Sequence, residues 1–250
     1  MLIKDQAMVV KILKLSNSAL YSKRQEITNL SNAITFLGTQ TIKNLILQIS
    51  MVRIFPVEET EIPDFNPDTF WEHSLGTAYL TGILLKKLNL PQNEDYYLGG
   101  LLHDLGKLCI YQFYPQKFKE IVLLQIKNGC HDYEAEEEVL GVNHSEVGAF
   151  LAKRWNFKKE IVAAIGSHHA SLETPDVQVA VVRIANMFAL AAGLCFPWDH
   201  RVFDIVDDPA WDVLKHYAKG EVDVERLTFE ITDETAKVQE SVKELLSKKA

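Results

Sequence analysis

Apolar residues recur at three- and four-residue steps along most of this chain, which predicts helices with one buried face. The clearest run begins at Phe70 and ends at Leu84, and His73 lies on its apolar face. Gly38 has the place of a left-handed helix cap, and Thr39 can begin the next helix. We expect an all-α protein with helices near 8–21, 30–37, 39–52, 68–88, 92–111, 115–128, 133–140, 144–155, 158–169, 176–193, 208–220 and 233–248.

A stretch with Pro56, Pro63 and Pro67 and an acidic run at 58–61 interrupts this helical pattern. Clustered prolines resist continuous helix, so we place a boundary there. The expected units are a small N-terminal helical lobe (1–58), a larger helical lobe (66–200) packed against it, and a C-terminal helical extension (201–250). The last amphipathic helix is expected to dock back on the domain, with partner binding or dimerisation as the alternative.

The tight junction at Gly38 resembles a helix-turn-helix, which raises the question of nucleic-acid binding. The helix after it, near 41–49, is mostly apolar with Lys43 as its one basic residue, whereas a recognition helix needs an exposed polar face. A formal net charge of −8 also argues against a nucleic-acid partner. Packing is the better interpretation of the junction.

Four of the expected helices carry a polar side chain on the buried face: His73, Asp104, His168 and Asn186. An unpartnered buried polar group costs roughly 1–3 kcal/mol, so these groups should meet one another, water or a metal ion. The alternative is that each histidine bonds separately to a nearby backbone carbonyl. Imidazole and carboxylate are ligands that divalent first-row metals select, and the adjacent pair His103 and Asp104 can flank one ion.

These residues carry a family resemblance. The run 101–107 reads LLHDLGK, and with the histidines before and after it resembles the signature of metal-dependent HD phosphohydrolases. The segments 11–21, 32–38 and 143–155 resemble the HDOD family, the HD-related output domain of bacterial signalling proteins. Together these motifs span about residues 5 to 200. Members usually have further helical sequence ahead of the segment that Met1 enters, so the first lobe is expected to be incomplete.

The resemblance implies a divalent metal, with Fe, Mn, Mg, Zn and Ni not distinguished, and a lysine, Lys107, that can approach a substrate phosphate. Asn186 stands where HD phosphohydrolases have aspartate and brings no negative charge, which favours one weakly held ion over two. The chain also lacks the Gly-Tyr-Pro element of cyclic-di-GMP phosphodiesterases. The expected ligands are His73, His103, Asp104, His144, His168, His169 and Asn186.

The HDOD resemblance implies a regulatory signalling module with a retained, metal-binding pocket and no hydrolase activity. The main alternative is an active metal-dependent phosphohydrolase acting on nucleotide or cyclic-dinucleotide phosphoesters. A di-iron oxygenase is a third reading, and Asn186 counts against it. Signalling proteins, a second copy of the chain and a small phosphate-containing ligand are the expected partners.

Three cysteines without a CxxC pattern favour reduced thiols in a cytoplasmic protein. No membrane span is expected, because the longest apolar stretch, 177–194, is interrupted by polar residues. Ligating histidines usually donate their second N–H to an acceptor, and Glu72, Glu146 and Asp176 are candidates for that role.

Overall fold

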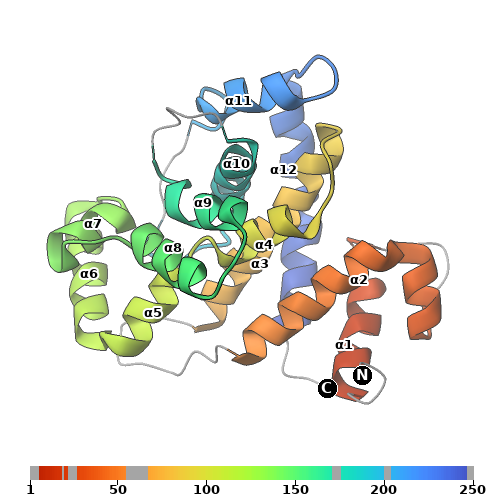
Figure 1. Cartoon of the computed structure of the whole chain (residues 1–250), viewed down its shortest axis with the longest axis horizontal. Coiled ribbons are helices and arrows are strands. Elements are labelled where there is room, and N and C mark those ends of the chain that lie inside the picture. Colours follow the sequence, from red (N-terminus) through yellow and green to blue (C-terminus); the bar gives the residue numbers. More distant parts are fainter. Residues whose placement is uncertain are drawn as a thin grey trace.

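The computed structural model describes residues 6–18, 20–21, 27–54, 67–170, 176–199 and 204–246, and every regular element within these ranges is a helix. This confirms the all-α fold class (Figure 1). The helices are α1 (Gln6–Ser16), α2 (Leu30–Ile54), α3 (Pro67–Lys87), α4 (Glu94–Leu102), α5 (Leu105–Phe113), α6 (Pro115–Asn128), α7 (Asp132–Leu140), α8 (His144–Arg154), α9 (Lys159–Ser167), α10 (Val177–Ala191), α11 (Ala210–Tyr217) and α12 (Val224–Leu246).

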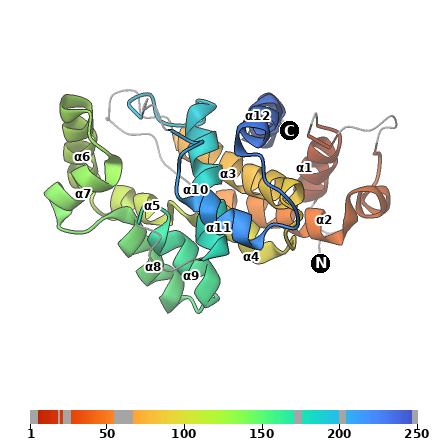
Figure 2. The ribbon, with the colours of Figure 1, turned by 90° about the horizontal axis from the view of Figure 1, so that it is seen from above.

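Helix α3 lies at the centre of the molecule and packs against α4, α10 and α12. Its side chains are buried nearly all round, as a helix without a polar face must be. Leu75, Ala78 and Leu80 are completely inaccessible to solvent. Helices α6 and α7 form a separate small cluster at one end of the molecule, around Phe118 and Ala135 (Figure 2).

The N-terminal helices α1 and α2 pack against each other, and α2 bends at Gly38. This glycine has φ 82° and ψ 159°, a conformation that other residues rarely adopt, so the expected break falls where the sequence placed it. Pro56 and Pro63 lie outside the described residues, and the lobe boundaries stay a prediction.

The single helix predicted near 92–111 is wrong. The chain forms α4 and α5 instead, and His103 and Asp104 occupy the junction between them. Asp104 has φ −97° and ψ 13°, outside the α-helical region, and this turns α5 towards α8. The break therefore places both residues at the meeting point of two helices.

Helix α12 begins nine residues earlier than the predicted 233 and docks along α3, with further contacts to α1 and α10. Its buried face includes Ile231, Val238 and Val242, each fully inaccessible. Ser241 Oγ bonds to Ser18 Oγ at 3.0 Å, and Lys87 Nζ lies 2.8 Å from Glu230 Oε2. In this structure the last helix therefore covers the domain itself.

Two further sequence expectations concern the cysteines and membrane spans. All three cysteines carry free thiols. Within the described residues, no helix combines the length and the apolar character that crossing a bilayer requires.

Candidate metal centre

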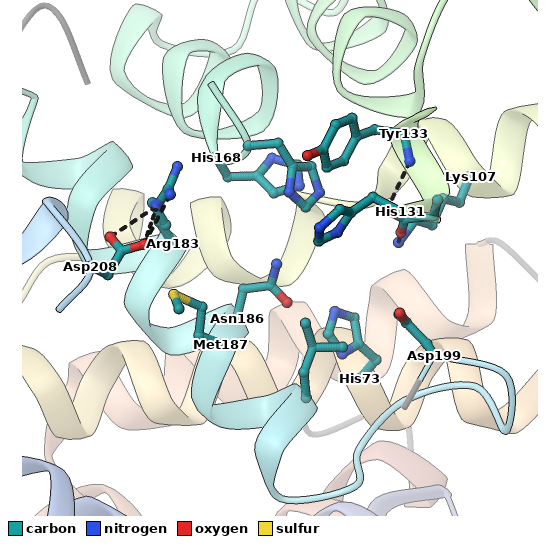
Figure 3. A pocket seen from close by; sticks show the side chains of 13 residues that line it. His73, Lys107, His131, Tyr133, His168, Arg183, Asn186, Met187, Asp199 and Asp208 are labelled. Carbon is teal, nitrogen blue, oxygen red and sulfur yellow. Dashed lines mark hydrogen bonds and ion pairs between the residues drawn. The ribbon is translucent and has the colours of Figure 1, made fainter. Parts of the chain in front are cut away.

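Polar side chains from α3, α8, α10, the end of α9 and the α4–α5 junction meet inside the molecule. In Figure 3, His73, His168 and Asn186 face a common space. The candidate ligand atoms form two groups, within each of which all atoms lie within 4.8 Å of one another, and Asp104 belongs to both. One group is His73, His103 and Asp104, and the other is Asp104, His144, His168 and His169.

A close crossing of α5 and α8 brings Asp104 and His144 together. A Cβ atom on Gly106 would lie 1.9 Å from the carbonyl oxygen of His144 and 2.9 Å from the nitrogen of Gly148. Glycine is required at position 106 because the two backbones touch there. This contact fixes the separation between the junction that carries Asp104 and the first turn of α8.

Each of four buried imidazoles bonds through Nδ1 to an acceptor outside the cluster. His73 Nδ1 bonds to the carbonyl oxygen of Leu194 at 2.7 Å, and His103 Nδ1 to that of Gly100 at 2.8 Å. His168 Nδ1 bonds to the carbonyl oxygen of Ile165 at 2.9 Å. A carbonyl can only accept, so we assign the hydrogen to Nδ1, which leaves a lone pair on Nε2 in the neutral ring.

Glu136 performs the same task for the fourth ring. Its Oε2 lies 2.7 Å from His144 Nδ1 and also accepts the backbone N–H of His144 at 2.6 Å. A carboxylate at this position orients the ring and increases its basicity as a ligand. This contact was missed in the sequence, since Glu136 stands within an acidic helix that looks like solvated surface.

The four Nε2 atoms converge on the carboxylate of Asp104. Those of His73 and His103 lie 3.4 and 3.5 Å from Oδ2. Those of His144 and His168 lie 3.2 and 3.6 Å from Oδ1. Within these pairs the nitrogens are also close to each other, 3.1 Å for His73 with His103 and 3.4 Å for His144 with His168. A cation between these lone pairs and the carboxylate would satisfy them together.

Burial keeps most of these rings neutral. It lowers the pKa of His73 and of His168, and it lowers the pKa of His103 well below its usual value, although Asp104 opposes the shift in each case. Burial acts in the same direction on His144, but there Glu136 outweighs it and the pKa is raised. Neutral imidazole is the form that binds a metal, so the centre is prepared for one.

Two further buried atoms point to a missing partner. His169 Nε2 and Asn186 Oδ1 are buried without a hydrogen-bond partner. Burial also holds the pKa of His169 well below its ordinary value. A metal ion beside the imidazole nitrogen and the amide oxygen would satisfy both atoms. The residues present therefore fit a divalent ion.

Asp104 remains ionised in this setting. Burial alone would raise its pKa, but His103, Lys107 and His144 outweigh burial and hold the pKa well below its usual value. Lys107 Nζ lies 2.7 Å from Asp104 Oδ2 and 2.6 Å from Asp132 Oδ2. The lysine expected to approach a phosphate is thus engaged by two carboxylates.

A cavity of about 190 Å³ opens beside this cluster. This volume exceeds that of one water site many times and suits a small ligand with its hydration. At its rim Arg183 forms a bidentate ion pair with Asp208, with Nε and one terminal nitrogen 3.0 and 2.9 Å from Oδ2. The cavity is lined by His73, Lys107, His131, Asp132, Tyr133, His168, His169, Arg183, Asn186, Met187, Leu190, Asp199 and Asp208.

None of the three carboxylates suggested as partners of the imidazoles is the Nδ1 acceptor of His73, His103, His144 or His168. Glu146 accepts the backbone N–H of Asn143 in a capping box, and Asp176 caps α10. Glu72 is half-buried, and burial raises its pKa against the opposing effect of Lys243. The imidazole acceptors are backbone carbonyls and Glu136, so this expectation is wrong. No feature of the sequence separates Asp132 and Glu136 from the other acidic residues of α7, since Glu134 and Glu138 share the same four-residue spacing.

Solved structures share this fold. An HDOD domain protein of unknown function from Geobacter sulfurreducens superposes with a TM-score of 0.88 at 28% identity, covering 98% of this chain and 84% of that one. A Shewanella amazonensis protein provisionally described as a phosphohydrolase superposes with a TM-score of 0.70 at 22% identity, covering 98% and 84%. The second likeness shows the fold alone.

Related sequences are longer than this chain. An uncharacterized protein of Treponema pallidum is 26% identical over 188 residues, which is 74% of this chain and 36% of that protein. Ribonuclease Y of Onion yellows phytoplasma is 30% identical over 121 residues, or 48% of this chain and 17% of the enzyme. The chain thus spans about a third of one relative and about a sixth of the other.

The match to a protein-family model extends over a longer stretch of the chain than the HD-type motif alone. The model of the HDOD domain matches residues 1–171, a stretch that contains the His103–Asp104 junction and the pair His168 and His169. The chain therefore belongs to the HDOD domain family.

Proposed function

We propose that this HDOD chain is a regulatory module whose HD-like centre holds a divalent metal ion. The observation that carries the proposal is the convergence of four imidazole Nε2 atoms on the single carboxylate of Asp104. All four Nδ1 atoms bond elsewhere, and a cation would give the Nε2 atoms a common partner. The two candidate ligand groups share Asp104, and Asn186 would add a neutral oxygen.

The nitrogen and oxygen donors suit first-row divalent metals, among which the donor set does not choose. A bound ion would supply a Lewis acid that attracts a phosphoryl oxygen. The adjoining cavity fits a small phosphate-containing ligand, with Lys107 at its wall. Ligand or metal occupancy would then be the signal that the module passes to a signalling protein or to a second copy of the chain.

Two features favour regulation over hydrolysis. Asn186 contributes no negative charge where HD phosphohydrolases have aspartate. The ammonium of Lys107 is already held by Asp104 and Asp132, which leaves it less available to a substrate. Binding a ligand asks less of the site than turning it over, because catalysis also needs a positioned nucleophile.

The second candidate function is metal-dependent phosphoester hydrolysis. It is favoured by the cavity, which is lined by Lys107 together with His73, His168 and His169. The partial similarity to ribonuclease Y gives it further support, since the matched region is 48% of this chain. In this reading a bound ion would activate water, and Lys107 would stabilise charge on the phosphoester.

Metal analysis followed by an activity assay separates the two candidates. The protein is stripped with EDTA, reconstituted separately with Mn²⁺, Fe²⁺, Zn²⁺, Ni²⁺ and Mg²⁺, and its metal content is measured. Each form is then assayed with bis(4-nitrophenyl) phosphate, nucleotides and cyclic dinucleotides. Asp104→Asn is the test variant, and Asp212→Asn, at an exposed carboxylate, is the matched control.

Stoichiometric metal without turnover, lost in Asp104→Asn and kept in Asp212→Asn, supports the regulatory proposal. Turnover that disappears in Asp104→Asn would replace it with the hydrolase. If no metal binds at stoichiometric level under any condition, the metal centre itself is refuted.

A further inference from the structure

Lys107 lies between two carboxylates at the edge of the candidate metal centre. Its Nζ is 2.7 Å from Asp104 Oδ2 and 2.6 Å from Asp132 Oδ2, and its side chain is 11% exposed. Both carboxylates are buried, with 2% of Asp104 and 8% of Asp132 accessible. Such charge-assisted bonds are strong because little water screens them.

The formal charges of this group create a problem for a divalent ion. Asp104 is the one carboxylate in both candidate ligand groups, and the imidazoles are neutral ligands. Lys107 by itself would cancel the charge of Asp104, and Asn186 adds none. A dication would then enter a buried site of no net negative charge, which costs free energy.

We propose that Asp132 offsets the charge of Lys107 and so leaves the carboxylate of Asp104 available to the metal, in a site where Asn186 adds no charge. Asp132 is then a positioning residue that acts through Lys107 rather than a ligand. This inference rests on the proposed function, since it concerns how the same centre accommodates its ion.

The position of Asp132 suits this role. It is the first residue of α7, where the helix dipole favours an anion, and its Oδ1 accepts the backbone N–H of Tyr133 at 2.9 Å. Asp132 and Asn186 line the same cavity. Burial would raise the pKa of Asp132, but Lys107, His144 and His169 outweigh it, and the carboxylate stays ionised.

Two other acidic side chains face the group. Glu136 is bonded to the ring and the backbone nitrogen of His144. Asp199 lines the cavity, and burial together with Asp132 raises its pKa to about 7. Asp132 Oδ2 lies 2.6 Å from Lys107 Nζ, the same ammonium that contacts Asp104.

A double-mutant cycle tests the proposal. The affinity of the whole chain for Mn²⁺, and in parallel for Zn²⁺, is measured by equilibrium dialysis for the unaltered protein, Asp132→Asn, Lys107→Met and the double variant. Glu138→Gln, at an exposed position of the same helix, removes the same charge away from the centre. Melting by circular dichroism checks that each variant is folded.

We expect Asp132→Asn to weaken binding about 10- to 100-fold, the usual effect of changing a residue that supports a metal ligand. Lys107→Met should bind at least as tightly as the unaltered chain, and the double variant should bind within about threefold of Lys107→Met, since the effect of Asp132 passes through the lysine. Adding Asn186→Asp to Asp132→Asn should restore binding. Glu138→Gln should leave the affinity unchanged.

Equal affinity of Asp132→Asn and the unaltered chain would overturn this inference while leaving the metal centre in place. An equally large loss from Asp132→Asn in the Lys107→Met background would also overturn it, because Asp132 would then act independently. If Asp132→Asn does not fold, weaker binding by Lys107→Met than by the unaltered chain overturns it. Absence of binding by the unaltered chain would instead refute the proposed function on which it rests.

Discussion

The hydrogen-bond partner of Nδ1 in a buried imidazole determines whether Nε2 carries a hydrogen or a lone pair. In His73, His103 and His168 the Nδ1–H donates to a backbone carbonyl, so the free lone pair on Nε2 faces Asp104. These bonds hold the rings in place whether or not an ion is bound. The same arrangement makes protons and metal ions competitors for the Nε2 atoms.

Protonation of these rings should make the metal-free fold sensitive to acid. Burial lowers the folded-state pKa of His73, His103, His168 and His169, whereas unfolded histidines titrate near pH 6.5. Below about pH 6.5 the unfolded chain therefore binds more protons than the folded chain does, and the free energy of unfolding decreases as the pH is lowered. The raised pKa values of His144 and Asp199 act oppositely, but they are the smaller number.

The melting temperature of the EDTA-treated protein, followed by circular dichroism, should decline between pH 7.5 and 5.0. His103→Gln should flatten this dependence, because it removes one such ring. His216→Gln, at an exposed position on α11, serves as the control and should preserve it. A melting temperature that stays constant or rises on acidification would contradict the assignment of neutral rings.

The histidines could be predicted from sequence because they occupy positions where an apolar helix face calls for leucine. Asp132 and Glu136 could not be separated from the other acidic residues of α7, since a carboxylate gives the same signal on a wet or a buried face. Asp199 lies outside any periodic segment. The sequence does not indicate which acidic side chains are buried.

The junction of α4 and α5 shows where periodicity stops being informative about elements. Tyr97, Leu101 and Leu108 keep one apolar face across the junction, which suggested one continuous helix. The direction of the chain changes at Asp104 while the face stays buried. Helix existence was therefore predictable, and the break was not, because both sides of it satisfy the same pattern.

Replacing Gly106 with alanine should disrupt both the fold and the site. The new Cβ would overlap the backbone of His144 on α8, and backbone cannot move aside as a flexible side chain can. We expect a loss of about 3 kcal/mol or more in unfolding free energy, measured with urea, together with loss of stoichiometric metal.

Gly82→Ala is the matched control. Gly82 lies within α3 and nothing stands within 4 Å of its added Cβ, so alanine should leave stability unchanged or raise it by about 1 kcal/mol. Comparable stability of the two variants would show that α5 and α8 do not approach as closely as described.

The last helix, α12, connects parts of the molecule that are far apart in the sequence. Helix α12 contacts α3, α10 and α1, so it joins the N-terminal helices to the part that carries the histidines. Lys11 Nζ, on α1, lies 3.4 Å from the carbonyl oxygen of Leu245, on α12, and this contact links the first helix to the end of the last. We infer that the described helices unfold together.

Ile231→Ala tests this cooperativity. The side chain is fully buried in the interface of α12, so its truncation should cost about 2–5 kcal/mol. Urea unfolding should remain a single transition at a lower midpoint, by tryptophan fluorescence and by circular dichroism. Phe229→Ala, at a position of the same helix that is 69% exposed, should change stability by about 0.5 kcal/mol or less. Two separate transitions would show that α12 and the N-terminal helices form an independent unit.

The short turn after α10 is held from both sides. The side-chain amide of Gln239, on α12, donates to the carbonyl oxygen of Ala192, and two residues later the carbonyl oxygen of Leu194 accepts from the ring of His73. A protein that drew α12 away would release the turn and, with it, the acceptor that aligns His73. Binding of that protein to the C-terminal helix and release of the ion would then occur together. Free metal would appear in solution when the protein is added.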